Sequence, residues 1–319
     1  MAKVKTAKVK RKKFTFDDLE LFLLSLPTVV WFAIFSYLPM FGIIISFKNY
    51  RLQSGKGFIY SLVASDWVGI DNFKFLFASA DTWPMLRNTI GYNLLFIALG
   101  VVIPVTLAIM ISNLYSQKFG KVCQTAMFLP HFMSWVVAAY FVFAFLSVEK
   151  GLVNNLIAGA GGEKIPWYSA EAMGWWPFLL VAMQIWKTTG YSMVVYLASI
   201  TGIDSTYYEA AVIDGATKWQ QAWKITIPLL KPIMIIMTIM AVGRIFNSDF
   251  GLFYQVPRNS GPLYPVTQTM DVYIYNALMK MNDIGMSSAA AFFQSVCGCI
   301  TICLANWIVT KVDSENAFF

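Results

Sequence analysis

The sequence predicts an all-α membrane protein with six transmembrane helices and both termini in the cytoplasm. Hydrophobic residues make up 58% of the 319 residues and charged residues only 13%, whereas roughly a quarter of a soluble domain is charged. Apolar stretches of about 20 residues recur, which is the length that crosses ~30 Å of hydrocarbon. The net charge of +7 arises at the N-terminus, where seven Lys and Arg residues precede the first acidic residue, Asp17.

Six stretches have the required length between charged or turn-rich breaks. We expect spans at about residues 21–46, 89–114, 123–146, 175–198, 232–246 and 289–309. The fourth contains Lys187, and the short fifth contains Arg244. The first is too long for the apolar segment of a cleaved signal peptide and is followed by no small-residue cleavage site, so we interpret it as a retained anchor.

The distribution of Lys and Arg sets the predicted orientation. A basic tail, residues 1–20, is placed in the cytoplasm, and residues 21–319 form the transmembrane domain. The cytoplasmic connections then include the loop 200–231. The connections on the opposite side are longer and rich in aromatic residues and turn formers, so we expect short interfacial helices there.

Composition argues against several classes of site. A nucleic-acid surface needs basic residues spread over a folded face, but the excess here is confined to the tail. The four cysteines fall in or near apolar stretches, which disfavours a disulfide framework. With His131 as the single histidine and no paired-cysteine motif, we expect no metal site.

The loop 200–231 contains residues of the kinds that start and end helices. Thr206–Glu209 and Thr217–Gln220 both match the capping box of a helix start. Between them Asp214 and Gly215 form a turn pair, because glycine adopts a positive φ without steric cost. The loop therefore predicts two short helices joined at Gly215.

Two prolines follow these helices. We expect Pro228 to end the second helix and Pro232 to occupy the first turn of the next span.

Helices this short need an apolar partner to persist. They offer one set of small apolar side chains and one of large ones, of which one set could pack on the membrane domain and the other could enter a pocket of a second protein. The alternative is an amphipathic helix that lies at the membrane interface without a protein partner.

The same loop resembles the EAA loop of ABC-importer permeases. The resemblance is carried by Glu209-Ala210-Ala211, Asp214-Gly215-Ala216, Trp219, Ile225 and Pro228. It implies a type I importer fold and a coupling helix that docks on a cytoplasmic ATPase. The implied docking residues are Glu209, Ala210, Ala211, Asp214, Gly215, Ala216 and Trp219. The chain has no GxxxxGK[ST] phosphate loop, so ATP and Mg²⁺ are expected on partner ATPase chains and no cofactor in this one.

Further segments are similar to the carbohydrate branch of that family. They include Trp67–Phe73, Arg87–Thr89, Phe128–Pro130 and Gly151–Asn154, while Phe293–Ser295 resembles the polysaccharide and complex-oligosaccharide group. Two positions depart from the family pattern: Ala222 replaces a frequent aromatic residue, and Ser260 replaces a glycine.

The resemblance also implies a set of partners in a bacterial plasma membrane. These are a second permease subunit, two ATPase subunits, an extracellular or periplasmic solute-binding protein and an oligosaccharide substrate. A heterodimer of permeases is expected, and a homodimer stays open, as does the identity of the glycan. No catalytic residue is expected.

Polar residues within the spans are candidates for a substrate path, because ionisable groups there usually face a cavity or a partner. Gln184, Lys187 and Tyr191 have the spacing of one helix face. Arg244, Asn247 and Asp249 form a second cluster at the end of the fifth span. The complete set of candidates is Ser134, Gln184, Lys187, Tyr191, Arg244, Asn247, Asp249 and Gln294.

The alternative role of these residues is to hold the bundle together, with Arg244 and Asp249 paired. We expect His131, next to Pro130, to form hydrogen bonds at a helix kink.

Two other function classes compete. An ion-coupled carrier would show internal repeats and carboxylates at the span centres, whereas the acidic residues here avoid them. A membrane-embedded enzyme would need a nucleophile, a base or a metal cluster at depth, and the sequence offers a lone histidine and no buried pair of acids.

Overall fold

The computed structural model describes residues 15–53 and 55–312 of the chain. In this part of the chain the regular elements are helical, apart from one antiparallel bridge between Lys48 and Trp67. The predicted all-α class is therefore confirmed. The basic residues of the predicted tail fall within residues 1–14, outside the described residues.

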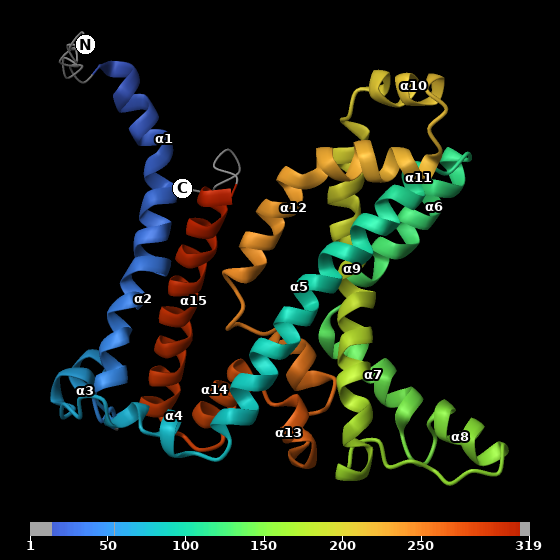
Figure 1. The fold of residues 1–319 in the computed structure, drawn as a ribbon. Coiled ribbons are helices and arrows are strands. Elements are labelled where there is room, and N and C mark those ends of the chain that lie inside the picture. The colour runs from blue at the N-terminus through green and yellow to red at the C-terminus, as the bar shows by residue number, and fades with distance from the viewer. Residues whose placement is uncertain (1–14, 54, 313–319) are drawn as a thin grey trace.

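The α-helices are joined by loops and by short 3₁₀ and π-helical turns (Figure 1). Their bounds are α1 Phe16–Phe32, α2 Leu38–Met40, α3 Phe58–Ala64, α4 Phe75–Ala78, α5 Thr82–Ser112, α6 Gln117–Phe128, α7 Trp135–Leu146, α8 Leu152–Gly159, α9 Trp176–Thr201, α10 Ser205–Ile213, α11 Lys218–Gln221, α12 Ile227–Val242, α13 Tyr264–Thr267, α14 Met270–Met279 and α15 Ile284–Val312.

Within the described residues, four continuous helical stretches are long and apolar enough to cross a membrane. They are Phe16–Phe47, Thr82–Ser112, Lys218–Val242 and Ile284–Lys311. These four overlap the first, second, fifth and sixth predicted spans. The fourth predicted span, 175–198, is also a single helix, α9, but it is less apolar than these four because polar residues such as Gln184 and Lys187 interrupt it.

The third predicted span, 123–146, is broken into α6 and α7, which meet at an angle of 98°. Pro130 lies in the 3₁₀ turn Leu129–Phe132 between them and has no amide proton to continue the helix. Ser134 then starts α7, since its side chain accepts a hydrogen bond from the Val137 amide at 3.3 Å. The pair adds a fifth candidate crossing only if it is counted as one bent span.

The prediction that Pro228 ends a helix is wrong. The helix runs without a stop from Lys218 to Val242, and a π-helical turn, Ala222–Thr226, lies just before the proline. A π-helical turn shifts the hydrogen-bond pattern, so the missing proline amide is accommodated locally. Pro232 lies inside α12 rather than in its first turn.

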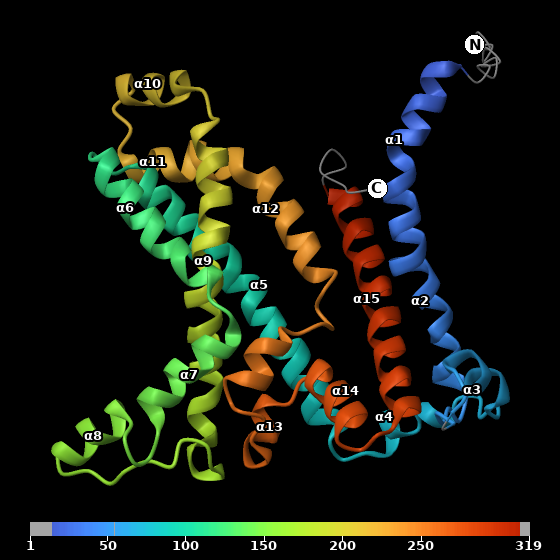
Figure 2. The ribbon, with the colours of Figure 1, turned by 180° about the vertical axis from the view of Figure 1, so that it is seen from behind.

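The centre of the bundle is formed by α5 packed along α9 (Figure 2). Towards one end, Ala108, Met193 and Tyr196 are fully buried in an apolar core; towards the other, Trp176 and Leu180 anchor a second core. The α6 backbone crosses α9 at Gly190, where a Cβ atom would overlap the carbonyl of Met127. A side chain at that position would separate the two helices.

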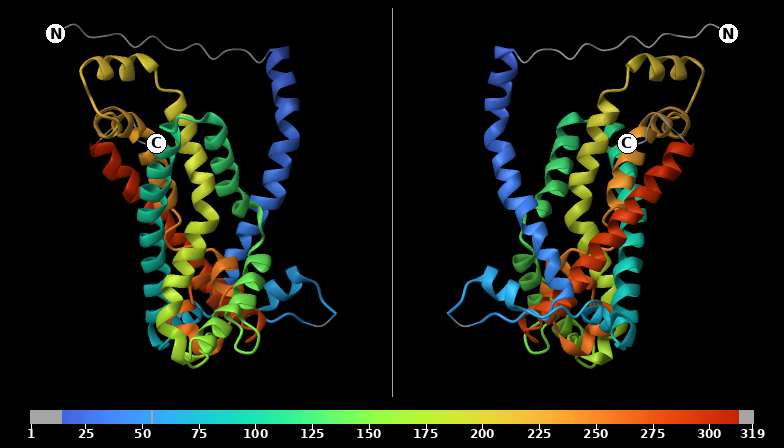
Figure 3. Two further views of the ribbon diagram at one scale, coloured as in Figure 1. Left: turned by 90° about the vertical axis from the view of Figure 1, so that its right-hand side faces the viewer. Right: turned by 90° about the vertical axis from the view of Figure 1, so that its left-hand side faces the viewer.

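Helix α1 stands at the edge of the bundle and none of its residues is buried (Figure 3). The chain joins the bundle through the following 3₁₀ turn, Phe41–Phe47, which packs against α15. The start of α1, the end of α15 and helix α10 lie at one end of the molecule, whereas α3, α8 and α13 lie at the other (Figures 1 and 3). The short helices predicted in the long connections are thus present.

Candidate functional site

The loop 200–231 projects α10 away from the bundle. Asp204 caps this helix, because its carboxylate accepts a hydrogen bond from the Thr206 amide at 2.9 Å, which also lowers the pKa of Asp204. Ser205 donates to Glu209 Oε1 at 2.9 Å. The capping box predicted at Thr206–Glu209 is therefore wrong, since Thr206 already lies inside the helix.

The turn that ends α10 matches the prediction. Gly215 has a φ of +75°, and the amide of Ala216 donates to the Ala211 carbonyl at 2.8 Å. Thr217 then forms the predicted capping box of α11, with its amide donating to Gln220 Oε1 at 2.8 Å. No neighbouring atom lies within 4 Å of the position a Cβ would take at Gly215, so backbone conformation alone favours glycine there.

Most of the loop's surface faces outward. No residue of α10 is buried, and the side chains of Ile213 and Trp219 are 86% and 72% exposed. The loop is attached to the next helix by a hydrogen bond of 2.9 Å between Tyr208 and Thr226. The arrangement presents apolar and acidic groups on a fixed turn that the other described residues leave uncovered.

The residues expected at an ATPase contact share this surface. Glu209, Ala210, Asp214, Gly215 and Trp219 are exposed, and Ala211 and Ala216 are half-buried. Four of these residues, Ala211, Asp214, Gly215 and Ala216, also line a hollow of about 400 Å³ between α10 and the helix that follows, Lys218–Val242.

A cavity of about 480 Å³ lies among α5, α9, α12 and the segment 244–249, and we call it the central cavity. It is lined by Asn93, Phe96, Ile97, Gly100, Val101, Gln184, Thr188, Ser192, Tyr196, Met237, Thr238, Ala241, Arg244, Asn247, Ser248 and Asp249. Hydroxyl, amide and charged groups are thus gathered inside an otherwise apolar bundle.

Four of the predicted path residues line this cavity: Gln184, Arg244, Asn247 and Asp249. Gln184 Oε1 and the Tyr196 hydroxyl are buried and have no hydrogen-bond partner in the described part of the chain. Buried polar atoms are rarely left unpaired, so these two atoms mark places in the cavity wall where the described residues leave a hydrogen-bonding group unsatisfied.

Arg244 and Asp249 do not form the ion pair considered from the sequence. Asp249 instead accepts a hydrogen bond from Trp135 Nε1 at 2.6 Å and further bonds from the Gly251 and Leu252 amides. Arg244 is an exposed residue that lines the cavity, and its guanidinium has no hydrogen bond or ion pair within residues 15–53 and 55–312. The cavity therefore holds a cation that no acidic side chain neutralises by contact.

The other four predicted path residues have structural contacts. Ser134 caps α7, and Gln294 donates to the Phe246 carbonyl at 2.7 Å and to Asp271 at 3.1 Å. Lys187 donates to the carbonyls of the broken α6–α7 segment, and the Tyr191 ring stacks on His131 with ring centroids 4.8 Å apart.

Gln184 therefore faces the central cavity, whereas Lys187 and Tyr191 cover the helix break. The cavity face of α9 carries Gln184, Thr188, Ser192 and Tyr196 at intervals of four, a helical stripe that the choice of Lys187 and Tyr191 overlooked. Within the described residues, no group of three His, Cys, Asp or Glu side chains is placed to hold a metal ion.

Comparison with known proteins matches residues 100–314 to the model of the family described as binding-protein-dependent transport system inner membrane component. The polygalacturonan/rhamnogalacturonan transport system permease protein YteP of Bacillus subtilis (strain 168) is 33% identical over 98% of this chain and 95% of its own. Protein LplB of the same organism is also 33% identical, over 94% and 92%.

Solved structures match at similar coverage. A chain of a bacterial ABC transporter involved in import of the acidic polysaccharide alginate superposes with a TM-score of 0.82 at 30% identity. The match covers 93% of this chain and 97% of that one. The same kind of transporter in complex with a periplasmic protein bound to an alginate pentasaccharide matches with a TM-score of 0.81.

Proposed function

Because the chain belongs to the family of inner-membrane components of binding-protein-dependent transport systems, we propose that it is a permease subunit of an ATP-driven oligosaccharide importer. Members of this family are transport subunits rather than enzymes, and ATP hydrolysis belongs to separate chains. In this proposal the chain forms half of the translocation path, and a second permease forms the other half.

The central cavity is the observation that carries the proposal. A sugar presents many hydroxyls that need hydrogen-bond partners when they leave water. The cavity supplies them from Gln184, Thr188, Ser192 and Tyr196 on α9 and from Asn247. Phe96, from α5, adds an aromatic surface for the apolar face of a sugar ring.

We propose fragments of acidic polysaccharides as the substrate class. The Arg244 guanidinium faces the central cavity without an acidic contact, and a guanidinium fork matches a carboxylate. Two similar proteins support the same class: YteP is named for polygalacturonan and rhamnogalacturonan, and the solved importer carries alginate, an acidic polysaccharide.

Coupling to the ATPase is assigned to α10 and the turn that follows it. Glu209 and Asp214 offer polar contacts, Ala210, Ala211 and Ala216 permit close approach, and Trp219 offers an exposed aromatic side chain. The uncovered position of α10 supports this assignment, because a short helix without buried residues gains little from its own chain.

The membrane arrangement is part of the same proposal. Six crossings, with α6 and α7 as one bent crossing and α9 as another, place both termini and α10 on the cytoplasmic side of a bacterial plasma membrane. The start of α1, the end of α15 and helix α10 lie at one end of the molecule, which supports this topology (Figure 1). The partners are a second permease, two ATPases that bind ATP and Mg²⁺, and an extracellular or periplasmic solute-binding protein.

Copurification tests the proposal. A tagged chain, solubilised from its native membrane in mild detergent, is expected to bring down an ATPase and a second permease. Purification of the chain without an ATPase, under conditions that keep a known importer complex intact, would contradict it.

A further inference from the structure

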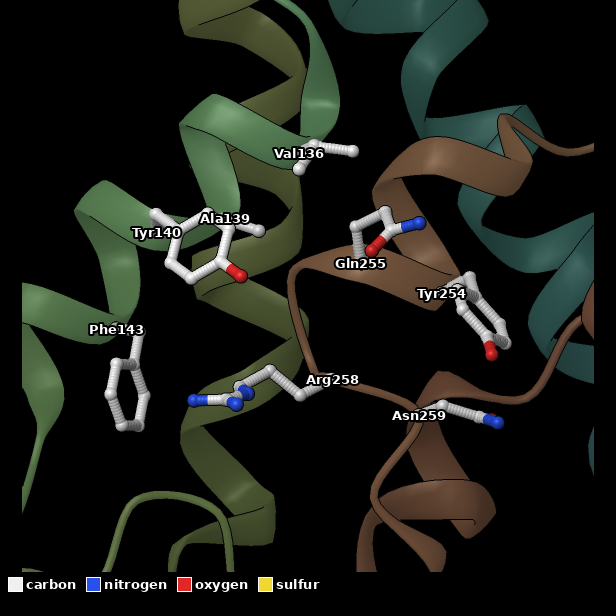
Figure 4. A pocket seen from close by; sticks show the side chains of 8 residues that line it. All are labelled: Val136, Ala139, Tyr140, Phe143, Tyr254, Gln255, Arg258 and Asn259. Carbon is white, nitrogen blue, oxygen red and sulfur yellow. The ribbon is translucent and has the colours of Figure 1, made fainter.

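A second cavity lies beside the central one and contains none of the predicted path residues. It is an open cavity lined by α7 and the segment 254–259 and has a volume of about 230 Å³ (Figure 4). Three aromatic rings, of Tyr140, Phe143 and Tyr254, and the polar side chains of Arg258 and Asn259 line it. We call it the outer cavity, because α7, which lines it, lies in the half of the molecule opposite to α10 (Figure 1).

Arg258 is the only charged residue of this cavity. Its guanidinium extends towards Phe143, with Cζ 4.1 Å from the ring centroid (Figure 4). In the part of the chain that the structure describes, the guanidinium has no hydrogen bond and no acidic partner. Its side chain is exposed, so the five N–H donors of the fork remain open to a ligand.

The backbone at this point is held in a conformation that most residues avoid. Arg258 and Asn259 have φ values of +55° and +47°, which an arginine adopts only when the surroundings enforce it. The enforcing contacts are present: the Asn259 amide donates to the Tyr254 carbonyl at 2.9 Å, and its side chain bonds to Tyr264 at 2.9 Å and to Asn276 at 3.0 Å. The loop therefore fixes where Arg258 emerges.

The polar lining of the outer cavity is not a general property of α7. Another side of the same helix, with Phe141 and Phe145, lines a hollow that is almost wholly apolar together with Met183 and Trp186 of α9. An apolar hollow suits lipid or another helix, whereas rings combined with a guanidinium and amides suit a polar ligand that has apolar faces.

The two cavities are adjacent along the chain. Asp249 lines the central cavity, and Tyr254 and Gln255, one turn of π-helix later, line the outer one. On α7, Trp135 donates to Asp249, and the next residue, Val136, lines the outer cavity. Residues that line the two cavities are thus neighbours in the chain and are joined by the Trp135–Asp249 hydrogen bond.

We propose that the outer cavity is a separate subsite for an acidic sugar unit, in which Arg258 binds the carboxylate and Tyr140 and Tyr254 contact the apolar faces of the ring. This inference rests on the proposed function and adds an entry subsite to it. A uronate unit would bind here before it reaches Arg244. The guanidinium would donate two parallel N–H···O bonds to the carboxylate, and no covalent step is involved.

The test uses the complete importer in cells, supplied with labelled trigalacturonate and, separately, with its fully methyl-esterified form. At subsaturating concentration, Arg258→Gln is expected to lower uptake of the acid about tenfold, because a charge-assisted hydrogen bond is lost. Uptake of the ester, which has no carboxylate, should change less than about twofold, and Arg258→Lys should fall in between.

The matched control is Arg51→Gln, which removes an exposed arginine that lines neither cavity. It should transport both probes like the wild type. The amount of assembled complex is measured for each variant. If Arg258→Gln fails to assemble, Tyr140→Leu replaces it: this change at a 66% exposed ring should lower uptake of both probes at low concentration and not at saturation.

The outcomes separate the two claims. Wild-type cells that import neither probe would overturn the proposed substrate class and this subsite with it. Wild-type import of the acid, with Arg258→Gln either unchanged or equally impaired for acid and ester, would overturn the subsite alone, since Arg258 would then have no role or a purely structural one.

Discussion

Lys187 Nζ lies 2.9 Å from the carbonyl oxygen of His131, across the point where α6 gives way to α7. A second bond, of 2.5 Å, reaches the Met133 carbonyl, and the Trp135 ring centroid is 5.3 Å away. Pro130 breaks the helix and leaves carbonyls there without intrahelical donors. A lysine in the middle of a candidate span thus pairs with the backbone groups that the break exposes.

This contact predicts a loss of stability when the donor is removed. Lys187→Met should destabilise the detergent-solubilised chain by about 2 kcal/mol, because hydrogen bonds from a charged donor contribute roughly 1.5–3 kcal/mol. Thermal unfolding followed by tryptophan fluorescence measures the shift. The control is Lys121→Met on α6, whose side chain is exposed. Equal melting temperatures for the two variants would show that the contact contributes nothing.

Because α6 and α9 cross closely at Gly190, we expect that a larger side chain is not tolerated there. Gly190→Leu should prevent assembly of the complex, because even the Cβ atom would overlap the Met127 carbonyl. Membrane-inserted protein and copurifying subunits are quantified together. Gly100→Leu is the control, since a Cβ there meets no atom within 4 Å. Normal assembly of Gly190→Leu would contradict the close approach.

Because the turn at Gly215 has a positive φ, we expect a β-branched residue there to uncouple transport from the ATPase. Gly215→Val places a β-branched residue at a φ of +75°, which costs about 1–3 kcal/mol of strain and should distort the proposed ATPase contact. We expect membrane levels like the wild type but a loss of substrate uptake and of ATPase copurification. Gly202→Val, at a φ of −84°, is the control, and full uptake by Gly215→Val would remove Gly215 from the coupling surface.

Because Arg244 lines the central cavity, we expect the cavity to favour acidic substrates over uncharged ones. Arg244→Gln should lower uptake of labelled trigalacturonate about tenfold, because the carboxylate loses its cationic partner. Uptake of the methyl-esterified form should change little. An equal fall for both probes would show that Arg244 supports the fold of segment 244–249 rather than the substrate.

Much of the fold could be predicted because its determinants are local. Apolar length located the helices, and the glycine and capping residues at Gly215 and Thr217 located the turn and the start of α11. The family was predicted correctly from the spaced set Glu209 to Pro228 together with segments elsewhere in the chain.

Two errors concern local features that residue spacing did not reveal. Asp204, rather than Thr206, caps α10, and the pattern of spacing alone did not distinguish the two. The helix continues through Pro228 because a π-helical turn absorbs the missing donor, a feature with no sequence signature.

Part of the candidate site could also not be predicted from the sequence. The side of α9 that faces the cavity depends on where α6 breaks and crosses α9 at Gly190. Lys187 and Gln184 were therefore grouped together from the sequence, although they contact different elements. Arg258 was not a candidate, because it lies in a connection rather than a span and only the fold brings it to α7.

Reconstitution in liposomes measures whether this chain is part of an ATP-driven importer. The complete complex is placed in sealed liposomes with its solute-binding protein outside and ATP with Mg²⁺ inside, and accumulation of labelled trigalacturonate is followed. We expect accumulation against a gradient that requires internal ATP and the binding protein. Accumulation driven by a proton or sodium gradient in the absence of ATP would contradict it.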